Sequence, residues 1–494
     1  MGDKSKTRAT SKTRATRKTR AEDERYAQAV AKLVHTIRRE VREKLGPNST
    51  FEQRRDAAAG LVKDALWKDE DDDLGELTTN AEEVEVEGRR YRRLTQRSSA
   101  VYYGRWGEHV VEESLYRELG THNGPTIKPI ELRVGMIARH MTPDLARIVG
   151  ELGADRSSRE VEQTLRTVGL VPPSRAFLER RFKQMAGEIA EEIDALEEKA
   201  REATAVPKQV ASISCGMDRF SVRMSEPVED SEQAPASPRR TEPYVRTPPP
   251  PKEYHYRKAW VGTTTVYDEE GNALHTWRYA TEADDDPAAL AERVAADVAW
   301  VLGEHPRAPV HVIQDAAPEL GVLPATLTEV LPANCSPVEL VDLEHLMGYL
   351  DGVVDACEPE ADPRDMKGWY RGELLRDDRA IDRIWRSLRQ KARSLPGRST
   401  QARKAVAAAL RYIRHRKEKM RYASFHGHNL PVGSGATEST CWAMARRVKR
   451  AGQSWETMGL RATLAVRGLV LSGRWELAWQ PYAASHRKEV RMVA

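Results

Sequence analysis

The sequence predicts an α/β domain with a large helical insertion, preceded by a mainly helical region that contains a small antiparallel β element. Three observations predict this class. From about residue 206, apolar alternating runs and helical runs follow in the order strand, hairpin, helix, strand, helix, strand. Residues 344–429 keep helical spacing and are strongly basic, and residues 82–118 alternate with a period of two.

Length and composition set the outer limits. A chain of 494 residues with 40% hydrophobic and 31% charged residues has room for two to four domains. No apolar run approaches the roughly 18 residues of a membrane span, and the N-terminus lacks the apolar core of a signal peptide. The four cysteines are far apart and form no CxxC pair, which favours a reducing cytoplasm without a disulfide framework or a zinc site.

The net charge of +4 hides two basic blocks. Residues 1–22 repeat the motif SKTRAT and are predicted to be a disordered basic arm that contacts nucleic acid, although a solubilising tail has the same composition. Residues 364–421 contain 19 Lys/Arg and 6 Asp/Glu, a local balance of 19 − 6 = +13. Such a segment attracts a polyanion and makes its binding depend on salt.

The N-terminal half divides into three predicted parts. Residues 23–80 form a helical segment followed by an acidic linker at 68–76. Residues 81–120 form a small β-rich element with turns at Gly88 and near Ser98. Residues 121–205 are helical again.

Within this last part the sequence favours two short helices around a turn. Ser157 and Glu160 form a capping box, Gly169 ends the first helix, and prolines precede the second. The second helix carries Arg175, Arg180 and Arg181. This pattern is compatible with a helix-turn-helix that reads DNA, although any helical hairpin shares it.

Residues 206–343 are predicted to be the first part of an α/β core. A strand at 209–224 is followed by a proline-rich loop at 225–252 that we expect to be disordered. A hairpin turn follows at 268–272, then a helix at 286–304, a buried strand at 308–315 and a further strand at 337–343. This order of elements is the opening of an RNase H-like sheet.

Three acids stand out by their positions. Asp218 is the only acid in its apolar strand, Asp315 ends the strand at 308–315, and Glu438 begins a helix after a run of small residues. Strand ends are where ligands gather in α/β sheets. Two divalent ions clamping a phosphoryl group need carboxylate oxygens, which predicts that these acids bind Mg²⁺, with Mn²⁺ as an alternative. Taken one by one, an exposed residue or a turn cap is the commoner role of an acid.

The C-terminal segment resembles a known family. The stretch LPVGSGATEST, the basic helix after it, AGQSW and LAVRGLVLSGRWELAW are similar to the C-terminal signature of bacterial insertion-sequence DDE transposases, above all the Kra-type group. The resemblance covers roughly residues 206–480. It implies that Asp218, Asp315 and Glu438 are the catalytic, metal-binding trio, and that residues 430–480 complete the core before a tail at 481–494.

The resemblance also implies partners and supporting residues. An Asp-x-x-His element is matched by Asp342 and His345, which would support the metal site from outside or cap a helix. The expected partners are double-stranded DNA, as terminal inverted repeats and as target, and further copies of the chain. The implied activity is strand cleavage and strand transfer with two Mg²⁺ ions. The DNA backbone is expected along the helix after Glu438, at Arg446, Arg447, Lys449 and Arg450.

Two positions depart from the family pattern. Arg219 follows Asp218 where the family usually has glycine, and Ala-Ala-Pro follows Asp315. Two alternatives therefore stay open. One is a catalytically idle or domesticated DNA-binding protein derived from a transposase. The other is a metal-dependent RNase H-like nuclease that does not join strands.

Overall fold

The computed structural model describes residues 4–227, 251–282, 287–332, 335–357, 363–394 and 400–493. These residues form a mixed α/β protein with many helices, as the sequence predicts at that level. The chain divides into two compact units. Unit 1 comprises Met1–Leu145, Glu162–Ser174 and His486–Ala494, and unit 2 comprises Ala146–Val161 and Arg175–Ser485.

The first two helices of unit 1 are longer than the sequence suggested. Helix α1 spans Lys4–Leu45 and α2 spans Phe51–Glu76. The predicted disordered arm is thus helical from residue 4, and the predicted acidic linker is the end of α2. Neither helix contains proline, and the side chain of Thr50 caps α2 in a reciprocal pair with Gln53. Charge alone does not interrupt a helix when no residue breaks it.

The sheet of unit 1 has the strand order β10-β1-β2-β3-β4. The predicted turn at Gly88 is confirmed, because Glu87 and Gly88 both have positive φ between β1 and β2. The predicted turn near Ser98 is wrong, because β2 continues through it with a register shift and the chain reverses at 104–107. The strands are β1 (Glu83–Val86), β2 (Arg89–Tyr103), β3 (Glu108–Glu118), β4 (Thr126–Ile127) and β10 (Val490–Val493).

The acidic end of α2 packs against this sheet through a buried histidine. The ring nitrogens of His109 lie 3.0 Å from Glu70 Oε2 and 3.2 Å from Asp71 Oδ1. Burial lowers the pKa of His109, but the two carboxylates outweigh burial and raise that pKa above its usual value. The acids of the predicted linker therefore serve as docking groups.

A buried glutamate makes unit 1 sensitive to pH. Glu113 is 3% exposed, its Oε1 accepts the hydroxyl of Tyr102 at 2.8 Å, and its Oε2 has no hydrogen-bond partner among the described residues. Burial is the main cause that raises the pKa of Glu113 to about 7. The folded state therefore binds the proton of Glu113 more tightly than the unfolded state does, which stabilises unit 1. This contribution is fully present below the unfolded pKa near 4.5 and is lost as the pH rises through about 7.

Glu113→Gln is expected to remove this dependence. At pH 8 the free energy of opening at the amides of β2 and β3 should be about 2–3 kcal/mol higher in the variant than in wild type. At pH 4 the two proteins should differ little. Hydrogen exchange followed at both pH values checks the difference. A gain of the same size at pH 4 and pH 8 would contradict the assignment.

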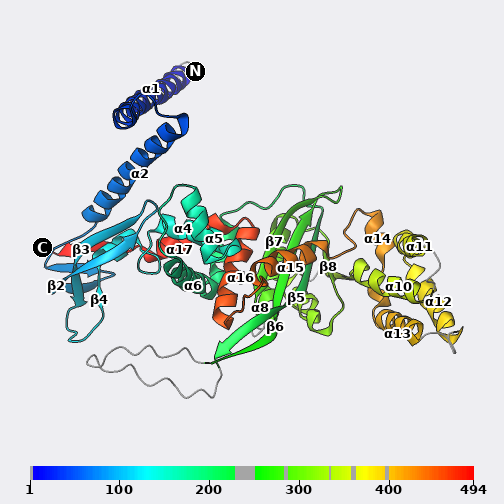
Figure 1. The fold of residues 1–494 in the computed structure, drawn as a ribbon. Helices are drawn as coiled ribbons and strands as arrows, with labels where there is room; N and C mark the ends of the chain where they lie inside the picture. The colour runs from blue at the N-terminus through cyan, green and yellow to red at the C-terminus, as the bar shows by residue number, and fades with distance from the viewer. Residues whose placement is uncertain are drawn as a thin grey trace. The chain divides into compact units, whose positions relative to one another are not determined.

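The sheet of unit 2 has the order β7-β6-β5-β8-β9 (Figure 1). Strands β5, β6 and β7 are antiparallel, whereas β8 runs parallel to β5 and β9 parallel to β8. The predicted hairpin turn between β6 and β7 is confirmed, with Asp268 binding both the backbone and the side chain of Asn272. The strands are β5 (Ser212–Pro227), β6 (Lys252–Tyr267), β7 (Ala273–Thr281), β8 (Val310–Gln314) and β9 (Val338–Val341).

The ends of β5 and β6 extend into the predicted loop at 225–252. Both Ser225 and Lys252 lie in strands, so the loop is shorter than expected at each end. Its remaining residues, 228–250, lie outside the described residues.

Helices cover both faces of this sheet. Helix α8 (Pro287–Glu304) and α9 (Val322–Val330) pack on one face around Met217 and Val294. Helix α15 (Gly435–Val448) and α16 (Thr457–Leu471) pack on the other around Val222 and Leu464, as Figure 1 shows. Both faces of β5 are covered, because Ile213, Cys215 and Met217 belong to the first core and Phe220, Val222 and Met224 to the second.

The helical prediction for residues 344–429 is confirmed for the described part of this segment. Its helices share a core of their own, which also includes residues from β8 and β9. They are α10 (Leu343–Cys357), α11 (Pro363–Arg376), α12 (Ala380–Ser394), α13 (Thr400–Arg414), η2 (Lys417–Lys419) and α14 (Tyr422–Gly427).

The predicted helical region at 121–205 is also helical, apart from the short strand β4. Ser157 and Glu160 form the predicted capping box, since the backbone N–H of Ser157 donates to Glu160 Oε2 at 2.8 Å and the N–H of Glu160 to Ser157 Oγ at 3.4 Å. The helices are α3 (Pro129–Val134), α4 (Pro143–Asp155), α5 (Ser158–Thr167), α6 (Arg175–Glu191) and α7 (Ile193–Glu202). The remaining elements are η1 (Pro318–Gly321) and α17 (Trp475–His486).

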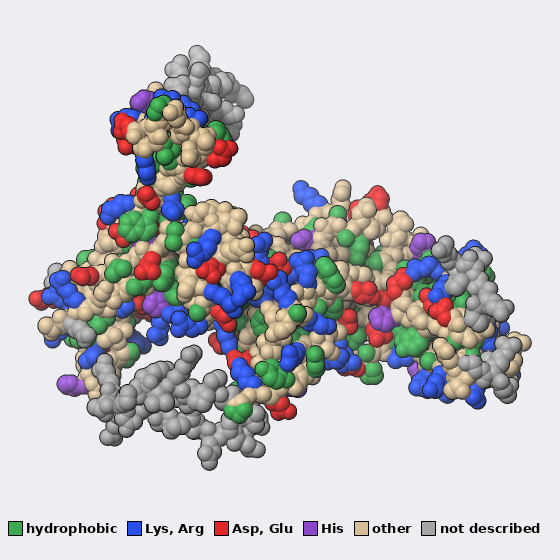
Figure 2. Space-filling view, in the orientation of Figure 1, with side chains coloured by type: hydrophobic (Ala, Val, Ile, Leu, Met, Phe, Trp, Pro, Cys, Tyr) green, Lys and Arg blue, Asp and Glu red, His purple; other side chains and the backbone are tan. Residues whose placement is uncertain are grey.

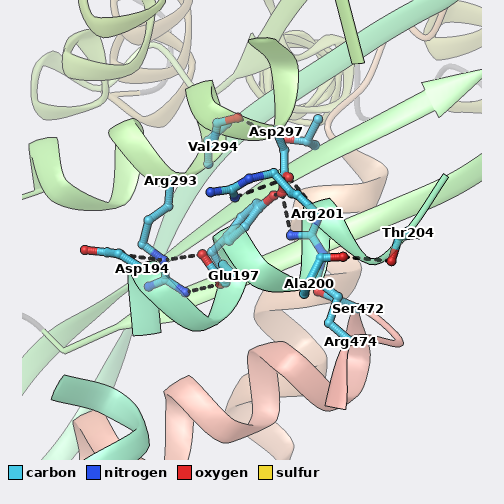
Figure 3. A network of polar contacts seen from close by, with 12 residues as sticks. Asp194, Glu197, Ala200, Arg201, Thr204, Arg293, Val294, Asp297, Ser472 and Arg474 are labelled. Atoms are coloured by element: carbon cyan, nitrogen blue, oxygen red, sulfur yellow. Dashed lines mark hydrogen bonds and ion pairs between the residues drawn. The ribbon is translucent and has the colours of Figure 1, made fainter. Parts of the chain in front are cut away.

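A buried polar network joins α7, α8 and the turn after α16 (Figure 3). Asp297 is fully buried and accepts two hydrogen bonds of 2.7 Å from Arg474, which is 3% exposed. Tyr279 also donates to Asp297, and Arg201 lies 3.5 Å from its Oδ1. The arginine of the Gly-Arg-Trp-Glu motif therefore anchors the chain after α16 to the core.

Among the described residues, no helix combines the length and the apolar character that crossing a bilayer requires.

Candidate metal and nucleic-acid site

The central feature of unit 2 is a row of three aspartates, with Asp218 within β5, Asp315 directly after β8 and Asp342 directly after β9. Ile213, Ser214 and Cys215 of β5 pair with Val310, His311 and Val312 of β8, an offset of 97 residues that equals the spacing of Asp218 and Asp315 in the sequence. Beyond these pairs, the amide of Met217 donates to the side-chain Oε1 of Gln314 at 3.3 Å. The last pair of β8 and β9 is Gln314 with Val341, and Asp315 and Asp342 are the next residues after these two. Asp218 therefore lies within β5, and Asp315 directly follows the neighbouring strand β8, which ends at Gln314 and not at Asp315 as the sequence predicts.

Asp218 is partly buried and is held from two sides. Its Oδ1 accepts the amide of Arg219 at 2.7 Å, and its Oδ2 accepts the thiol of Cys441 at 3.3 Å. Burial raises the pKa of Cys441, and the charge of Asp218 raises that pKa further. Cys441 thus stays protonated and serves as a neutral donor that ties α15 to β5.

Asp315 is held by the helical insertion. The hydroxyl of Tyr412 on α13 donates to Asp315 Oδ1 at 3.1 Å, and the ring of Tyr412 stacks on Tyr349 with centroids 4.3 Å apart. Arg416 donates to the next carbonyl, that of Ala316, at 2.8 Å. Burial, followed by the charge of Asp315, raises the pKa of Tyr412, so the phenol remains a donor. The insertion therefore orients one of the candidate ligands.

The start of α15 is positioned by close contacts with β5. A Cβ at Gly216 would lie 2.4 Å from the carbonyl oxygen of Ile313 and 2.8 Å from Thr437 Oγ1, so glycine is required there. Thr437 also shares a hydrogen bond of 2.7 Å with Thr263. The next residue, Glu438, is exposed. The small residues that precede it bring the helix against the sheet and leave the carboxylate of Glu438 exposed to solvent.

Asp342 fixes the turn before α15. The amide of Ser434 donates to Asp342 Oδ2 at 2.8 Å, and the hydroxyl of Ser434 contacts both Asp342 and, at 3.3 Å, Glu438 Oε1. Burial would raise the pKa of Asp342, but the hydrogen bonds it accepts hold the pKa well below its usual range. Asp342 is therefore a charged residue that is largely occupied by structural contacts.

His345 forms a cluster with Asp342, the third aspartate of the row, and with Glu438. Asp342, His345 and Glu438 have ligand atoms that all lie within 4.8 Å of one another. Nδ1 of His345 lies 3.8 Å from Asp342 Oδ2, which is an ion-pair distance and too long for a hydrogen bond. The interaction with Asp342, together with the charges of Asp315 and Glu438, raises the pKa of His345 to about 9. The imidazolium thus partly balances the surrounding carboxylates.

The donor set fits a hard divalent cation. Among the described residues, no lysine or arginine pairs with Asp315 or Glu438, and the only side-chain partner of Asp218 is a neutral thiol. Neighbouring carboxylates without a cation repel one another, and a divalent ion with a preference for oxygen ligands relieves that repulsion. The chemistry of these residues therefore suits Mg²⁺ or Mn²⁺ better than Zn²⁺.

The predicted DNA-contacting residues at the end of α15 and directly after it divide into exposed and buried groups. Arg447 is 5% exposed and donates to the carbonyl of Gly153, so its side chain belongs to the packing and does not lie on an outer surface as expected. Arg450 pairs with Glu160, and Arg446 lies 3.2 Å from Asp155. Lys449 is exposed. The sequence could not distinguish exposed from buried basic residues, because it does not show which face of the helix packs against distant segments.

On α6, Arg175 and Arg180 are exposed, and Arg181 is half-buried with its Nη1 3.2 Å from Gln184 Oε1. The predicted helix-turn-helix contacts therefore stay predictions for these three residues.

A second basic surface lies on the insertion, where Figure 2 shows blue side chains around α13. We call it the α12–α13 surface. Its residues are exposed, and none pairs with a carboxylate of the described residues. Unpaired exposed cations of this kind are free to contact phosphates. They are Arg386, Arg389, Arg403, Lys404, Arg411 and Arg414.

Sequence reasoning missed Cys441, Tyr412 and Ser434. Cys441 follows Glu438 by one helical turn, so the spacing could have placed it beside the site. Tyr412 comes from a distant helix, and no local pattern marks it.

Neither the models of known protein families nor the sequences of curated proteins match this chain.

Proposed function

We propose that this protein is a DDE-type DNA transposase that cuts and joins DNA at the ends of a mobile element. The observation that carries the proposal is the parallel pairing of β5 with β8, whose offset of 97 residues equals the spacing of Asp218 and Asp315, together with Glu438 in the first turn of α15. The strand order β7-β6-β5-β8-β9, with three antiparallel and two parallel strands, supports an RNase H-like core. The helical insertion between the second and third acids is in keeping with it.

Asp218, Asp315 and Glu438 would hold two Mg²⁺ ions. When bound, such ions activate an attacking water or 3′-hydroxyl and stabilise the leaving oxygen of the phosphodiester. Three neighbouring side chains would orient these acids for metal binding. Tyr412 fixes Asp315, Cys441 fixes Asp218, and Ser434 links Glu438 to Asp342. The cation of His345 lies next to them and reduces their mutual repulsion before DNA binds.

The α12–α13 surface would hold flanking or target DNA through its phosphates. The double variant Arg411→Gln/Arg414→Gln is expected to weaken binding of all duplexes alike and to lower the slope of log K against log salt by about 2, because two phosphate contacts are lost. Fluorescence anisotropy across a salt series measures both quantities. The control is Arg371→Gln, because Arg371 is already paired with Glu344. A double variant with an unchanged slope would contradict this role.

The proposal is tested with the full chain, Mg²⁺ and labelled duplexes that carry the inverted repeats flanking the gene. Cleavage at the repeat ends, followed by joining of a 3′ end to target DNA, is the expected result. Cleavage without joining would replace the proposal with a nuclease. Binding without cleavage would replace it with an idle DNA-binding protein derived from a transposase.

A further inference from the structure

Unit 2 contains a pocket of about 450 Å³ that the catalytic proposal does not use. Residues of α4, α5, α6, α15, α16 and the edge of β5 and β6 line it. Five lining residues are basic and two are acidic, which gives a local balance of 5 − 2 = +3. The basic residues are Arg156, Arg175, Lys183, Lys252 and Arg447.

A buried arginine at this pocket has unused hydrogen-bonding capacity. Arg447 is 5% exposed, and its Nε donates to the carbonyl of Gly153 at 3.2 Å. Its Nη1 is buried and has no partner among the described residues. Leaving a buried charged donor unsatisfied is costly, so a ligand that accepts from Nη1 would be stabilised there. Burial lowers the pKa of Arg447 to about 10, which still leaves it charged at neutral pH.

The rest of the lining suits a planar, partly apolar body. The rings of Trp455 and Phe182 line the pocket together with the apolar side chains of Leu178 and Val161. Gln453 adds a buried Oε1 that has no hydrogen-bond partner among the described residues, and this oxygen can accept from an N–H donor. On the rim, Lys183 and Lys252 are held beside the pocket by Glu456.

From these features we infer that the pocket binds one nucleotide of a DNA strand, with the phosphate at Arg447 and the base beside the rings of Phe182 and Trp455. The guanidinium of Arg447 itself lies 5.2 Å from the ring centroid of Trp455, so the base would use the part of that ring that Arg447 leaves open. An anionic group joined to an aromatic body with N–H donors is the chemistry that this lining complements. Arg447 follows Glu438 by nine residues on α15, which is about 13 Å along the helix axis. The inference rests on the proposed function, because it places this nucleotide near the strand that Asp218, Asp315 and Glu438 would cut.

The test uses a variant that fills the pocket without removing a buried charge. Arg447→Ala would remove a buried side chain and destabilise the fold around it, whereas a Cβ at Gly459 would have its nearest contact 3.7 Å away, at Lys183 Cε. The leucine side chain of Gly459→Leu would therefore extend into the pocket. The substitution should not weaken α16, because leucine has a higher helix propensity than glycine. The matched control is Gly187→Leu on α6, where a Cβ would meet nothing within 4 Å and which does not line the pocket.

Binding is measured by titration calorimetry in EDTA with thymidine 5′-monophosphate, thymidine and inorganic phosphate as probes. Wild type and Gly187→Leu should bind the nucleotide at least about tenfold more tightly than either half, and Gly459→Leu should lose about tenfold or more of that affinity. Equal binding of inorganic phosphate and nucleotide would overturn the inference, and so would unchanged binding by Gly459→Leu.

The outcome is independent of catalysis, because no metal is present and no bond is cut. Asp315→Asn should bind thymidine 5′-monophosphate as wild type does. If wild type binds the nucleotide but never cleaves DNA, the proposed function fails and the pocket stands. If wild type cleaves DNA and does not bind the nucleotide, the pocket inference fails by itself.

Discussion

Asp315→Asn is expected to lower Mg²⁺-dependent DNA cleavage by at least about 10³-fold while leaving DNA affinity within about twofold. The asparagine keeps the size of the side chain and can still accept the hydroxyl of Tyr412, so the insertion stays docked. It removes the negative charge that the metal ions need. The rate of strand cleavage under single-turnover conditions and the anisotropy of a labelled duplex give the two values.

The matched control for this variant is Asp355→Asn. Asp355 lies on α10, its side chain is 56% exposed, and its partner is Lys367 outside the row of aspartates. This control should cleave within about twofold of wild type, since exposed ion pairs contribute little. If Asp315→Asn cleaved within about tenfold of wild type, Asp315 would not be a catalytic ligand.

Arg474→Met is expected to destabilise unit 2 by about 3–5 kcal/mol, because it leaves the carboxylate of Asp297 buried without its bidentate partner. The guanidinium of Arg474 also lies 5.3 Å from the ring centroid of Trp277, and that contact is lost as well. Urea unfolding followed by the fluorescence of the buried tryptophans measures the change. DNA affinity at temperatures where the variant is folded should be unaffected.

The double variant Arg474→Met/Asp297→Asn separates an unpaired charge from a loss of packing. Removing the charge of Asp297 should restore part of the stability, so the double variant should be more stable than Arg474→Met alone. Replacing both members of a buried pair is commonly less harmful than removing one. A single variant that costs less than about 1 kcal/mol would contradict the structural role of this pair.

The sequence predicted the elements of unit 2 well, because its signals there are local. Alternation, turn residues and a helix start gave the strands, the hairpin and α15. The gap between Asp218 and Asp315 had no meaning in the sequence, yet it equals the offset of the β5–β8 register. The spacing of 97 residues becomes informative only when the pairing of β5 with β8 is known.

Charge was a poorer guide than periodicity. The basic arm and the acidic linker were expected to lack helix, but both belong to long helices that no proline interrupts. Likewise, the arginines of α15 were expected to face DNA, but Arg447 is buried against α4. Whether a charged residue is exposed depends on its packing partners, and those come from segments far away in sequence. Tyr412 could not be found for the same reason.

The most direct measurement is the position of Mn²⁺ in crystals of the full chain soaked with that ion. Anomalous scattering should place manganese between the carboxylates of Asp218 and Asp315, with a second ion at Glu438, and Asp315→Asn should remove the first. Manganese at the cluster of Asp342, His345 and Glu438 alone, or none near Asp218 and Asp315, would contradict a two-metal centre built on this row of aspartates.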